Sequence, residues 1–238
     1  MKLSNFKQQA WKLLIASPDS YISKKAIHIN KELEDYEWKK RLKRANILGA
    51  EEIFTWTRPE ELKMLYELAL NCPQGGFALE IGSHLGASSC YIAAGLAQTG
   101  GQLFCVDTWN NEAMIEGEQD TFVQFKENTK GVEKLITPIR KWSNQLDERD
   151  IKQPLSLIFI DGDHRYDAVK HDFDLTQQWL AQDGIIVFHD FSNPDYEGVS
   201  RVVGEALASG EWVLLGKVDT LAWIRRAQWA QPFWLREN

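Results

Sequence analysis

Short apolar runs alternate with amphipathic stretches along the chain from residue 77 onward. The runs are rich in β-branched or aromatic residues and are bounded by turn residues, a pattern typical of buried strands. They cover residues 77–81, 102–106, 136–139, 155–160 and 185–189. Apolar positions at helical spacing predict helices between and after them, over residues 88–98, 121–128, 168–181 and 199–208. Strands that alternate with helices predict a parallel sheet covered by helices on both faces.

The last part of the chain extends this sheet. Residues 212–215 and 220–225 predict two further strands, which form an antiparallel hairpin at the sheet edge. We therefore expect an α/β fold, a three-layer sandwich around a mostly parallel, seven-stranded sheet, over residues 56–238.

A helical segment precedes the sheet. Residues 1–55 are expected to form an N-terminal helical extension. A firmer helix start follows at Thr57-Arg58-Pro59-Glu60, where Thr57 can cap the helix and Glu60 can close the capping box. Pro59 fits the first turn of this helix, which does not need its backbone N–H.

Composition narrows the class of protein. The 238 residues carry a formal net charge of -7, which argues against a general nucleic-acid binder. A local basic run over residues 39–44 follows a run of acidic residues, which favours the solvated face of a charged helix over a binding patch. We therefore predict no nucleic-acid partner.

Cysteine usage and hydropathy indicate the compartment. Cys72, Cys90 and Cys105 form no C-x-x-C pair, so neither a disulfide framework nor a thiolate zinc site is predicted. A reducing environment suits such a chain. No apolar run approaches the ~20 residues that cross a bilayer. The sequence predicts a cytoplasmic protein without a membrane partner.

The loop after the first strand has the pattern E-x-G-x-x-x-G, formed by Glu80, Gly82 and Gly86. Glycines let this backbone turn tightly and approach a ligand, and Ser88 or Ser89 can cap the next helix. His84 replaces the middle glycine of the dinucleotide fingerprint, which disfavours a pyrophosphate ligand. The acidic residue before the loop suits a ligand that carries an amino group.

Three strand ends carry the remaining polar groups. Asp107 ends the second strand, 25 positions after Gly82, where an acid can accept hydrogen bonds from ribose hydroxyls. The fourth strand runs into Asp161-Gly162-Asp163-His164, and the fifth runs into His189-Asp190. Because neighbouring parallel strands bring their ends together, Asp161 and Asp190 should face one cleft. The alternative is that Asp161 and Asp163 only end a strand and cap a helix.

These motifs together resemble the class I S-adenosylmethionine-dependent methyltransferases, and more narrowly the bacterial group that includes macrolide-sugar O-methyltransferases. The resemblance covers about residues 55–225 and implies a Rossmann-like fold. It implies that the cofactor S-adenosyl-L-methionine is held by Glu80, Gly82, Ser83, Gly86, Ser88 and Asp107. Ser143, after the third strand, matches a position that borders the adenine in relatives.

Methyl transfer to oxygen requires that the acceptor loses a proton, and two compatible routes are available. His164 can act as the general base, and Asp161 with Asp190 can hold Mg²⁺ as a Lewis acid. In the macrolide-sugar relatives, metal ligands match Asp161 and the His189-Asp190 pair, and a histidine base matches His164. His189 here replaces a glutamate. Because imidazole suits Mn²⁺, Fe²⁺ or Zn²⁺ better than Mg²⁺, this replacement favours one of those ions over Mg²⁺.

Several alternatives stay open at the level of sequence. The resemblance favours a small-molecule acceptor, a sugar or another hydroxyl-bearing secondary metabolite, while N-methylation and protein or RNA acceptors remain open. A homo-oligomer is also open. The competing functions are an NAD(P)-dependent oxidoreductase and a non-catalytic binding protein that keeps the fold. Trp109, Trp142 and Tyr166 are candidates either for the acceptor pocket or for the core.

Overall fold

The chain divides into two compact units, Met1–Arg44 and Ala45–Asn238, and the computed structural model describes residues 21–111 and 117–229. In the first unit, helix α2 (Tyr21–Arg44) ends with Arg41, Lys43 and Arg44 in its last turn. Positive side chains there interact favourably with the helix C-terminus. The Lys and Arg side chains within residues 39–44 are exposed, and Leu42 between them is buried. Residues 1–20 of the expected helical extension lie outside the described part.

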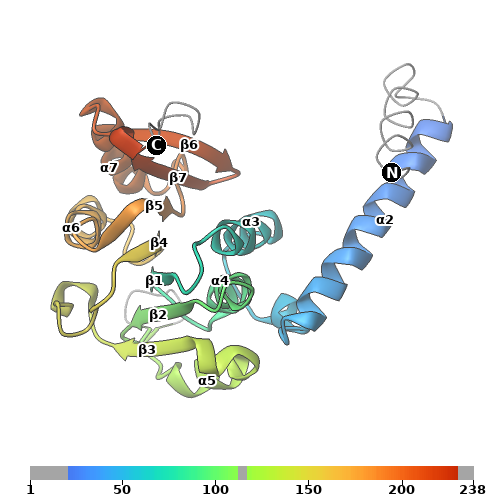
Figure 1. Cartoon of the computed structure of the whole chain (residues 1–238), viewed down its shortest axis with the longest axis horizontal. Helices are drawn as coiled ribbons and strands as arrows, with labels where there is room; N and C mark the ends of the chain where they lie inside the picture. The colour runs from blue at the N-terminus through green and yellow to red at the C-terminus, as the bar shows by residue number, and fades with distance from the viewer. Residues whose placement is uncertain (1–20, 112–116, 230–238) are drawn as a thin grey trace. The chain divides into compact units, whose positions relative to one another are not determined.

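A seven-stranded sheet forms the centre of the second unit (Figure 1). Its strands are β1 (Phe77–Ile81), β2 (Gln102–Asp107), β3 (Ile136–Arg140), β4 (Leu155–Ile160), β5 (Leu180–Phe188), β6 (Trp212–Val218) and β7 (Leu221–Arg226). Their order across the sheet is β3-β2-β1-β4-β5-β7-β6, and β1 to β5 are parallel. β7 runs antiparallel to both of its neighbours. The predicted parallel sheet with a C-terminal hairpin is confirmed.

Helices cover both faces of this sheet. They are α3 (Pro59–Leu70), α4 (Ala87–Ala97), α5 (Phe122–Asn128), α6 (Tyr166–Thr176) and α7 (Glu197–Ala208), with 3₁₀ turns η1 (Ala50–Glu52), η2 (Lys130–Leu135), η3 (Ser143–Gln145) and η4 (Ala227–Trp229). Figure 1 shows α3 and α4 on one side of the sheet and α6 and α7 on the other. α4 is buried almost throughout, because α3 packs over it. A side chain at Gly95 would lie 2.5 Å from the Tyr66 carbonyl oxygen, so this close packing requires glycine.

The central strands β1 and β4 are buried on both faces. Leu79 and Ile158 are completely buried, and Phe188 and Phe173 join them in one apolar cluster. Strands covered by helices on both sides have no solvent face, so their sequences are mostly apolar instead of alternating, with Glu80 in β1 and Ser156 in β4 as buried polar exceptions. The short, mostly apolar runs seen in the sequence follow from this position in the sheet.

The largest difference from the predicted element boundaries lies between α6 and β5. The helix expected over residues 168–181 ends at Thr176, and Leu180 already pairs with Leu155 in β5. The Leu155 backbone N–H donates to the Trp179 carbonyl oxygen at 2.7 Å, which pulls this segment into the sheet. Asp183, with a φ of 64°, interrupts the regular strand pattern before Ile185. Because of this irregularity, the sequence pattern did not predict the first half of β5 as a strand.

The strand order reverses direction between β1 and β4. From β1 the chain continues outward through β2 to β3, whereas from β4 it continues outward through β5 on the other side. In open sheets of this kind, ligands bind in the crevice outside the carboxyl ends of the strands at such a switch point. The residues that follow β1, β2, β4 and β5 therefore define where a site can lie.

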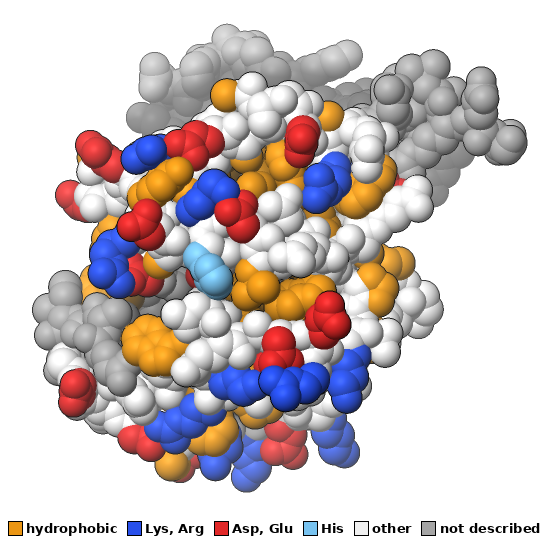
Figure 2. Space-filling model, turned by 90° about the vertical axis from the view of Figure 1, so that its left-hand side faces the viewer, with side chains coloured by type: hydrophobic (Ala, Val, Ile, Leu, Met, Phe, Trp, Pro, Cys, Tyr) orange, Lys and Arg blue, Asp and Glu red, His pale blue; other side chains and the backbone are white. Residues whose placement is uncertain are grey.

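The length of the helices and the charges on the surface were compared with what a membrane or a nucleic acid requires of a protein. Among the helices of the described residues, none is both long and apolar enough to cross a membrane. Figure 2 shows a face on which Lys and Arg side chains gather in the lower part, with Asp and Glu side chains between them. Basic and acidic side chains are therefore mixed on this face.

Candidate active site

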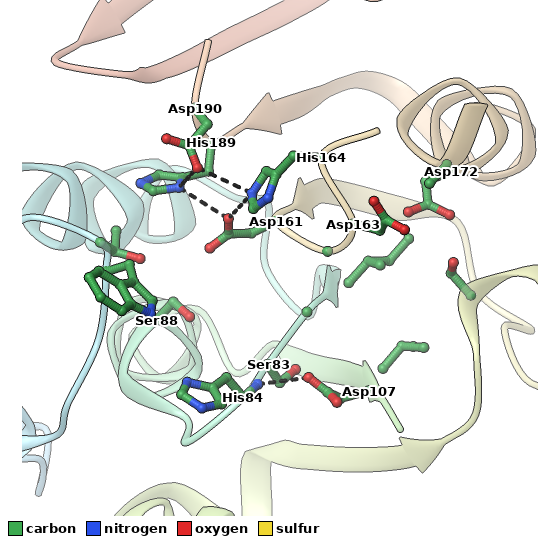
Figure 3. A pocket seen from close by; sticks show the side chains of 18 of the residues that line it. Ser83, His84, Ser88, Asp107, Asp161, Asp163, His164, Asp172, His189 and Asp190 are labelled. Carbon is green, nitrogen blue, oxygen red and sulfur yellow. Dashed lines mark hydrogen bonds and ion pairs between the residues drawn. The ribbon is translucent and has the colours of Figure 1, made fainter. Parts of the chain in front are cut away.

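A cavity of about 1380 Å³ lies at the carboxyl ends of β1, β2, β4 and β5. Its wall combines the loop after β1, the end of β2, η3, the loops after β4 and β5, and the segment before α3. Figure 3 shows the polar side chains that converge on it from these elements. The cavity thus lies at the switch point of the sheet.

The loop from Gly82 to Gly86 forms one wall of this cavity. Both glycines have a φ of 88°, a backbone conformation that residues with a side chain rarely adopt. A Cβ atom at Gly82 would lie 2.1 Å from the Asp161 carbonyl oxygen. The missing side chain therefore lets the ends of β1 and β4 touch, a contact between strands that the sequence prediction of a close approach to a ligand did not include.

Asp107 lies at the end of β2 and connects two loops. Its carboxylate accepts hydrogen bonds from the His84 backbone N–H at 2.8 Å and from the Trp109 backbone N–H at 2.6 Å. The Trp109 indole also donates to the His84 carbonyl oxygen at 2.9 Å. A carboxylate has about four acceptor positions, so Asp107 keeps acceptor capacity toward the cavity.

Glu80 lies behind the loop and is not part of the cavity wall. It is fully buried, and burial raises its pKa against the opposing effect of the Ser88 and Ser89 hydroxyls. The Ser89 hydroxyl donates to the Glu80 carboxylate. The prediction that Ser88 or Ser89 caps α4 is wrong, because Gly86 is the N-cap residue and the buried carboxylate attracts the serine hydroxyls instead.

Other predicted cofactor residues line the cavity. Gly82, Ser83, Gly86 and Ser88 form its wall on the β1 side, and Ser143 does so at the start of η3. The Ser83 hydroxyl is buried and has no hydrogen-bond partner among the described residues. A buried polar group without a partner in the protein needs one from a ligand or water.

Four side chains meet beneath the ends of β4 and β5, and we call them the His-Asp cluster: Asp161, His164, His189 and Asp190. His189 Nδ1 lies 3.1 Å from both Asp161 Oδ1 and Asp190 Oδ2. His164 Nε2 lies 3.1 Å from Asp190 Oδ2 and 3.5 Å from Asp161 Oδ1. Figure 3 shows this closed ring of contacts. The expectation that Asp161 and Asp190 face one cleft is met by these distances.

The four side chains of the His-Asp cluster shift one another's pKa values. Burial would lower the pKa of His164, but the carboxylates of Asp161 and Asp190 outweigh it and raise that pKa to about 9. The pKa of His189 is raised further by the same carboxylates, also against burial. Burial would raise the pKa values of Asp161 and Asp190, yet both are lowered by the two imidazoles. In this arrangement the two carboxylates favour the protonated form of both imidazoles.

Glu61 is a site residue that the sequence prediction missed. It is completely buried, and its Oε2 atom lies 3.1 Å from His189 Nε2. Its Oε1 atom accepts hydrogen bonds from the backbone N–H and the hydroxyl of Thr220, at 2.9 and 2.8 Å. Hydrogen bonds thus hold its pKa below the ordinary value, although burial alone would raise it.

The helix start beside Glu61 corrects the capping prediction. Arg58, not Thr57, is the N-cap residue of α3, and Glu61, not Glu60, closes the capping box by accepting the Arg58 backbone N–H at 2.9 Å. Pro59 is the first helical residue, which places N3 at Glu61. Pro59 was the sequence signal that could have placed the cap correctly.

Aromatic side chains border the cavity near the cluster. Tyr196 stacks on His164, with ring centroids 4.2 Å apart. Phe54 and Trp56 form an edge-to-face pair at 5.3 Å, and they are 51% and 61% exposed at the cavity wall. Such exposed aromatic rings are available to contact a second ligand.

The three aromatic residues considered from the sequence have different positions. Trp142 lines the cavity. Trp109 is completely buried and packs on Phe125. Tyr166 hydrogen-bonds Glu205 at 2.8 Å and is not part of the cavity wall.

Comparison with known proteins identifies the domain. Residues 79–191 match a family model described as a methyltransferase domain. These residues are a methyltransferase domain. The predicted class, the S-adenosylmethionine-dependent methyltransferases of class I, is thereby confirmed, and the domain contains the cofactor loop, Asp107 and the whole His-Asp cluster.

Solved structures share the fold of this methyltransferase domain. An O-methyltransferase from Bacillus cereus in complex with S-adenosylhomocysteine (SAH) has a TM-score of 0.56 at 17% identity, covering 79% of this chain and 91% of that chain. A TDP-rhamnose 3'-O-methyltransferase of calicheamicin biosynthesis has a TM-score of 0.54 at 17% identity, covering 93% of both chains. An rRNA methylase from Streptococcus thermophilus has a TM-score of 0.51 at 10% identity, covering 73% of this chain and 99% of that chain. The Rossmann-like methyltransferase fold is confirmed.

Proposed function

We propose that this chain transfers the methyl group of S-adenosyl-L-methionine to a hydroxyl oxygen of a small molecule. One observation carries the proposal: the cofactor loop with Asp107 and the His-Asp cluster line the same cavity. They meet where Gly82 contacts the backbone of Asp161. A cofactor bound along the loop would then lie next to groups that can activate an acceptor.

The residues around the loop fit this cofactor. Its amino-acid end would lie against the Gly82 backbone and the unpartnered Ser83 hydroxyl, and Asp107 would accept hydrogen bonds from its ribose. Glu80 would act from behind, through the Ser88 and Ser89 hydroxyls that it holds. When bound, S-adenosyl-L-methionine supplies an electrophilic methyl group for in-line displacement.

The His-Asp cluster fits a divalent cation. Ligand atoms around one ion with bonds of about 2.1 Å lie about 3.0 to 3.4 Å apart, depending on geometry. The contacts around the cluster are 3.1 to 3.5 Å, and all four ligand atoms lie within 4.8 Å of one another. Asp161, His189 and Asp190 would hold the ion, which would act as a Lewis acid toward the acceptor hydroxyl.

The ligand types favour a transition-metal ion over Mg²⁺. Imidazole nitrogen suits Mn²⁺, Fe²⁺ or Zn²⁺, whereas Mg²⁺ prefers oxygen ligands. The second ring nitrogen of His189 faces Glu61 at 3.1 Å. Metal-binding histidines commonly donate their other N–H to a carboxylate, which fixes the ring and raises its basicity. Glu61 therefore adds support to the proposed role of His189.

We assign removal of the acceptor proton to His164. Its Nε2 atom is buried and lies 3.1 Å from Asp190 Oδ2 and 3.5 Å from Asp161 Oδ1. A cation bound by these two carboxylates would offset their charge and so favour the neutral ring that can accept a proton. Tyr196 stacks on the ring and fixes its plane. A positioned base of this kind contributes about 10² to 10⁴-fold to the rate.

A hydroxyl-bearing ring is the acceptor that the cavity fits best. A volume of about 1380 Å³ exceeds the ordinary range for a single small ligand, about 300 to 1,000 Å³, and therefore leaves room for an acceptor beside the cofactor. Phe54 and Trp56 offer exposed rings on which a sugar or another ring can pack. The TDP-rhamnose 3'-O-methyltransferase with the same fold acts on a substrate of this kind.

Calorimetric titration with S-adenosyl-L-methionine tests the cofactor assignment. Asp107→Ala should weaken binding at least about 10-fold, because hydrogen bonds to a charged group are worth about 1.5 to 3 kcal/mol. Asp174→Ala is the matched control, since Asp174 is an exposed residue of α6 paired with Lys170. Absence of binding to the wild type would overturn the proposal.

Turnover with defined acceptors tests the reaction. Nucleotide-linked deoxysugars, catechols, amines and an rRNA fragment should be offered with Mn²⁺, and formation of SAH measured. Methyl transfer to a hydroxyl supports the proposal. Transfer only to nitrogen or to RNA overturns it.

A further inference from the structure

The two oxygen atoms of the Asp190 carboxylate have different partners. Oδ2 lies 3.1 Å from His164 Nε2 and 3.1 Å from His189 Nδ1, inside the His-Asp cluster. Oδ1 accepts a hydrogen bond from Nδ2 of the Asn193 side-chain amide at 2.6 Å. Because Asp190 is only 8% exposed, water has little access to either oxygen. One oxygen of Asp190 is therefore directed into the cluster, and the other is held by Asn193.

The loop after β5 is attached to its neighbours by bonds that do not involve the Asn193 side chain. The Phe191 backbone N–H donates to the Thr220 carbonyl oxygen at 2.9 Å, which joins the loop to the C-terminal hairpin. The Ser192 backbone N–H donates to the Ser200 hydroxyl at 2.8 Å, which joins the loop to α7. The path of the backbone is thus fixed from two sides. The hydrogen bond from Asn193 Nδ2 is left to orient the carboxylate.

The orientation of a carboxylate decides how it binds a cation. A carboxylate with one oxygen engaged by an amide presents its other oxygen alone, and so binds as a monodentate ligand. One such oxygen fills one position around a transition-metal ion of low coordination number. Ca²⁺, by contrast, takes about 6 to 8 oxygen ligands and often binds both oxygens of one carboxylate. A hydrogen bond that holds one oxygen back therefore disfavours Ca²⁺.

Asn193 lines the same cavity as the His-Asp cluster, and the mechanism proposed above gives it no role. The inference drawn from it rests on the proposed function, in which Asp161, His189 and Asp190 hold a divalent cation. We propose that Asn193 is a positioning residue that keeps Asp190 a monodentate ligand and so selects a transition-metal ion over Ca²⁺. Asn193 does not bind the ion itself and acts only through the Asp190 carboxylate.

Competition between Mn²⁺ and Ca²⁺ measures this selection. Displacement of Mn²⁺ by Ca²⁺, followed by electron paramagnetic resonance, gives the ratio of the two affinities, and the wild type should prefer Mn²⁺. In Asn193→Ala the Oδ1 atom is free, so Asp190 can turn and bind Ca²⁺ through both oxygens. The preference for Mn²⁺ should then fall at least about 10-fold, the lower end of the usual loss when a residue behind a metal ligand is removed. A general loss of stability weakens both ions alike and leaves the ratio unchanged.

Asn193→Ser separates this role from a role in the turn. The Asn193 side-chain oxygen also accepts the Asp195 backbone N–H at 3.1 Å, a bond that a serine hydroxyl can replace. Serine is too short to reach Asp190 at the same time, so the preference for Mn²⁺ should fall as it does in Asn193→Ala. Asn144→Ala is the matched control, because Asn144 is an exposed residue of η3 in the same cavity wall, and it should keep the wild-type preference.

The outcomes separate this inference from the function on which it rests. A preference that falls in both Asn193 variants and stays in Asn144→Ala supports the inference. Binding of Mn²⁺ with a preference that either Asn193 variant leaves unchanged overturns the inference alone. A wild type that binds SAH but not Mn²⁺ overturns the metal site together with the inference and leaves the cofactor assignment in place. Failure of the wild type to bind SAH overturns the proposed function itself.

Discussion

Glu61 Oε2 lies 3.1 Å from His189 Nε2, so a helix that packs on one face of the sheet holds an imidazole ring at the end of β5. Thr220, in the turn of the C-terminal hairpin, fixes the other oxygen of Glu61. The His-Asp cluster is therefore oriented by two elements that contribute no residue to the cluster itself.

Glu61→Gln should weaken binding of Mn²⁺ about 10- to 100-fold, the usual loss when the carboxylate behind a metal-binding histidine is removed. The neutral amide no longer fixes the charge and tautomer of His189. Metal titration by calorimetry or by Mn²⁺ electron paramagnetic resonance would measure the loss. Glu60→Gln, an exposed neighbour, is the control and should bind Mn²⁺ as the wild type does. Equal affinities in the two variants would contradict the role of Glu61.

Gly82→Ala should lower the free energy of unfolding by more than about 2 kcal/mol, because it combines a positive φ with a backbone collision at 2.1 Å. Gly75→Ala is the matched control, since Gly75 has a φ of 69° but open space around its Cβ position. It should cost only about 1 to 2 kcal/mol. Urea unfolding measures both, and similar losses would show that the contact with Asp161 is unimportant.

His164→Gln should reduce kcat about 10² to 10⁴-fold once an acceptor is known, because the base is lost. Affinity for SAH should stay within about threefold of the wild type, since His164 belongs to the acceptor side of the cavity. Metal content, measured by elemental analysis, should also be unchanged. Loss of the metal in this variant would instead make His164 a ligand of the ion.

Asp172→Asn should change how stability depends on pH. The pKa of Asp172 is raised from 3.8 to about 6 in the folded state, so the folded protein binds this proton more tightly than the unfolded chain. The resulting stabilisation is present below about pH 4 and is lost as the pH rises through about 6. The variant should therefore gain about 2 kcal/mol over the wild type between pH 4 and pH 8.

Urea unfolding at the two pH values checks this expectation. Asp174→Asn should show no comparable gain, because Asp174 is exposed and paired with Lys170. A parallel pH dependence of the wild type and Asp172→Asn would show that the carboxylate is not destabilised by burial.

The sequence predicts the sheet well because its central strands are buried on both faces. Mostly apolar runs such as residues 155–160, bounded by turn residues, are typical of buried strands in an α/β pattern. The boundary between α6 and β5 could not be found in this way. Leu180 continues the helical spacing of apolar residues, and its pairing with Leu155 depends on contacts far apart in the sequence.

The candidate site was predictable only in part, for a similar reason. Asp161 and Asp190 could be brought together because the carboxyl ends of neighbouring parallel strands meet. Glu61 could not, because its contacts with His189 and Thr220 depend on how α3 packs on the sheet. Asp172 stands between His171 and Phe173 in a helix, and no periodicity distinguishes a buried acid there from an exposed one.

The hydrogen bonds between Thr220 and Glu61 join positions 159 residues apart. The cofactor loop and Asp107, by contrast, belong to consecutive strands near the start of the sheet. Contacts between distant segments form late in folding, because a long loop must close before they are gained. We therefore expect the cofactor side to take shape first as the chain emerges from the ribosome, with the acceptor side completed only when the final hairpin docks.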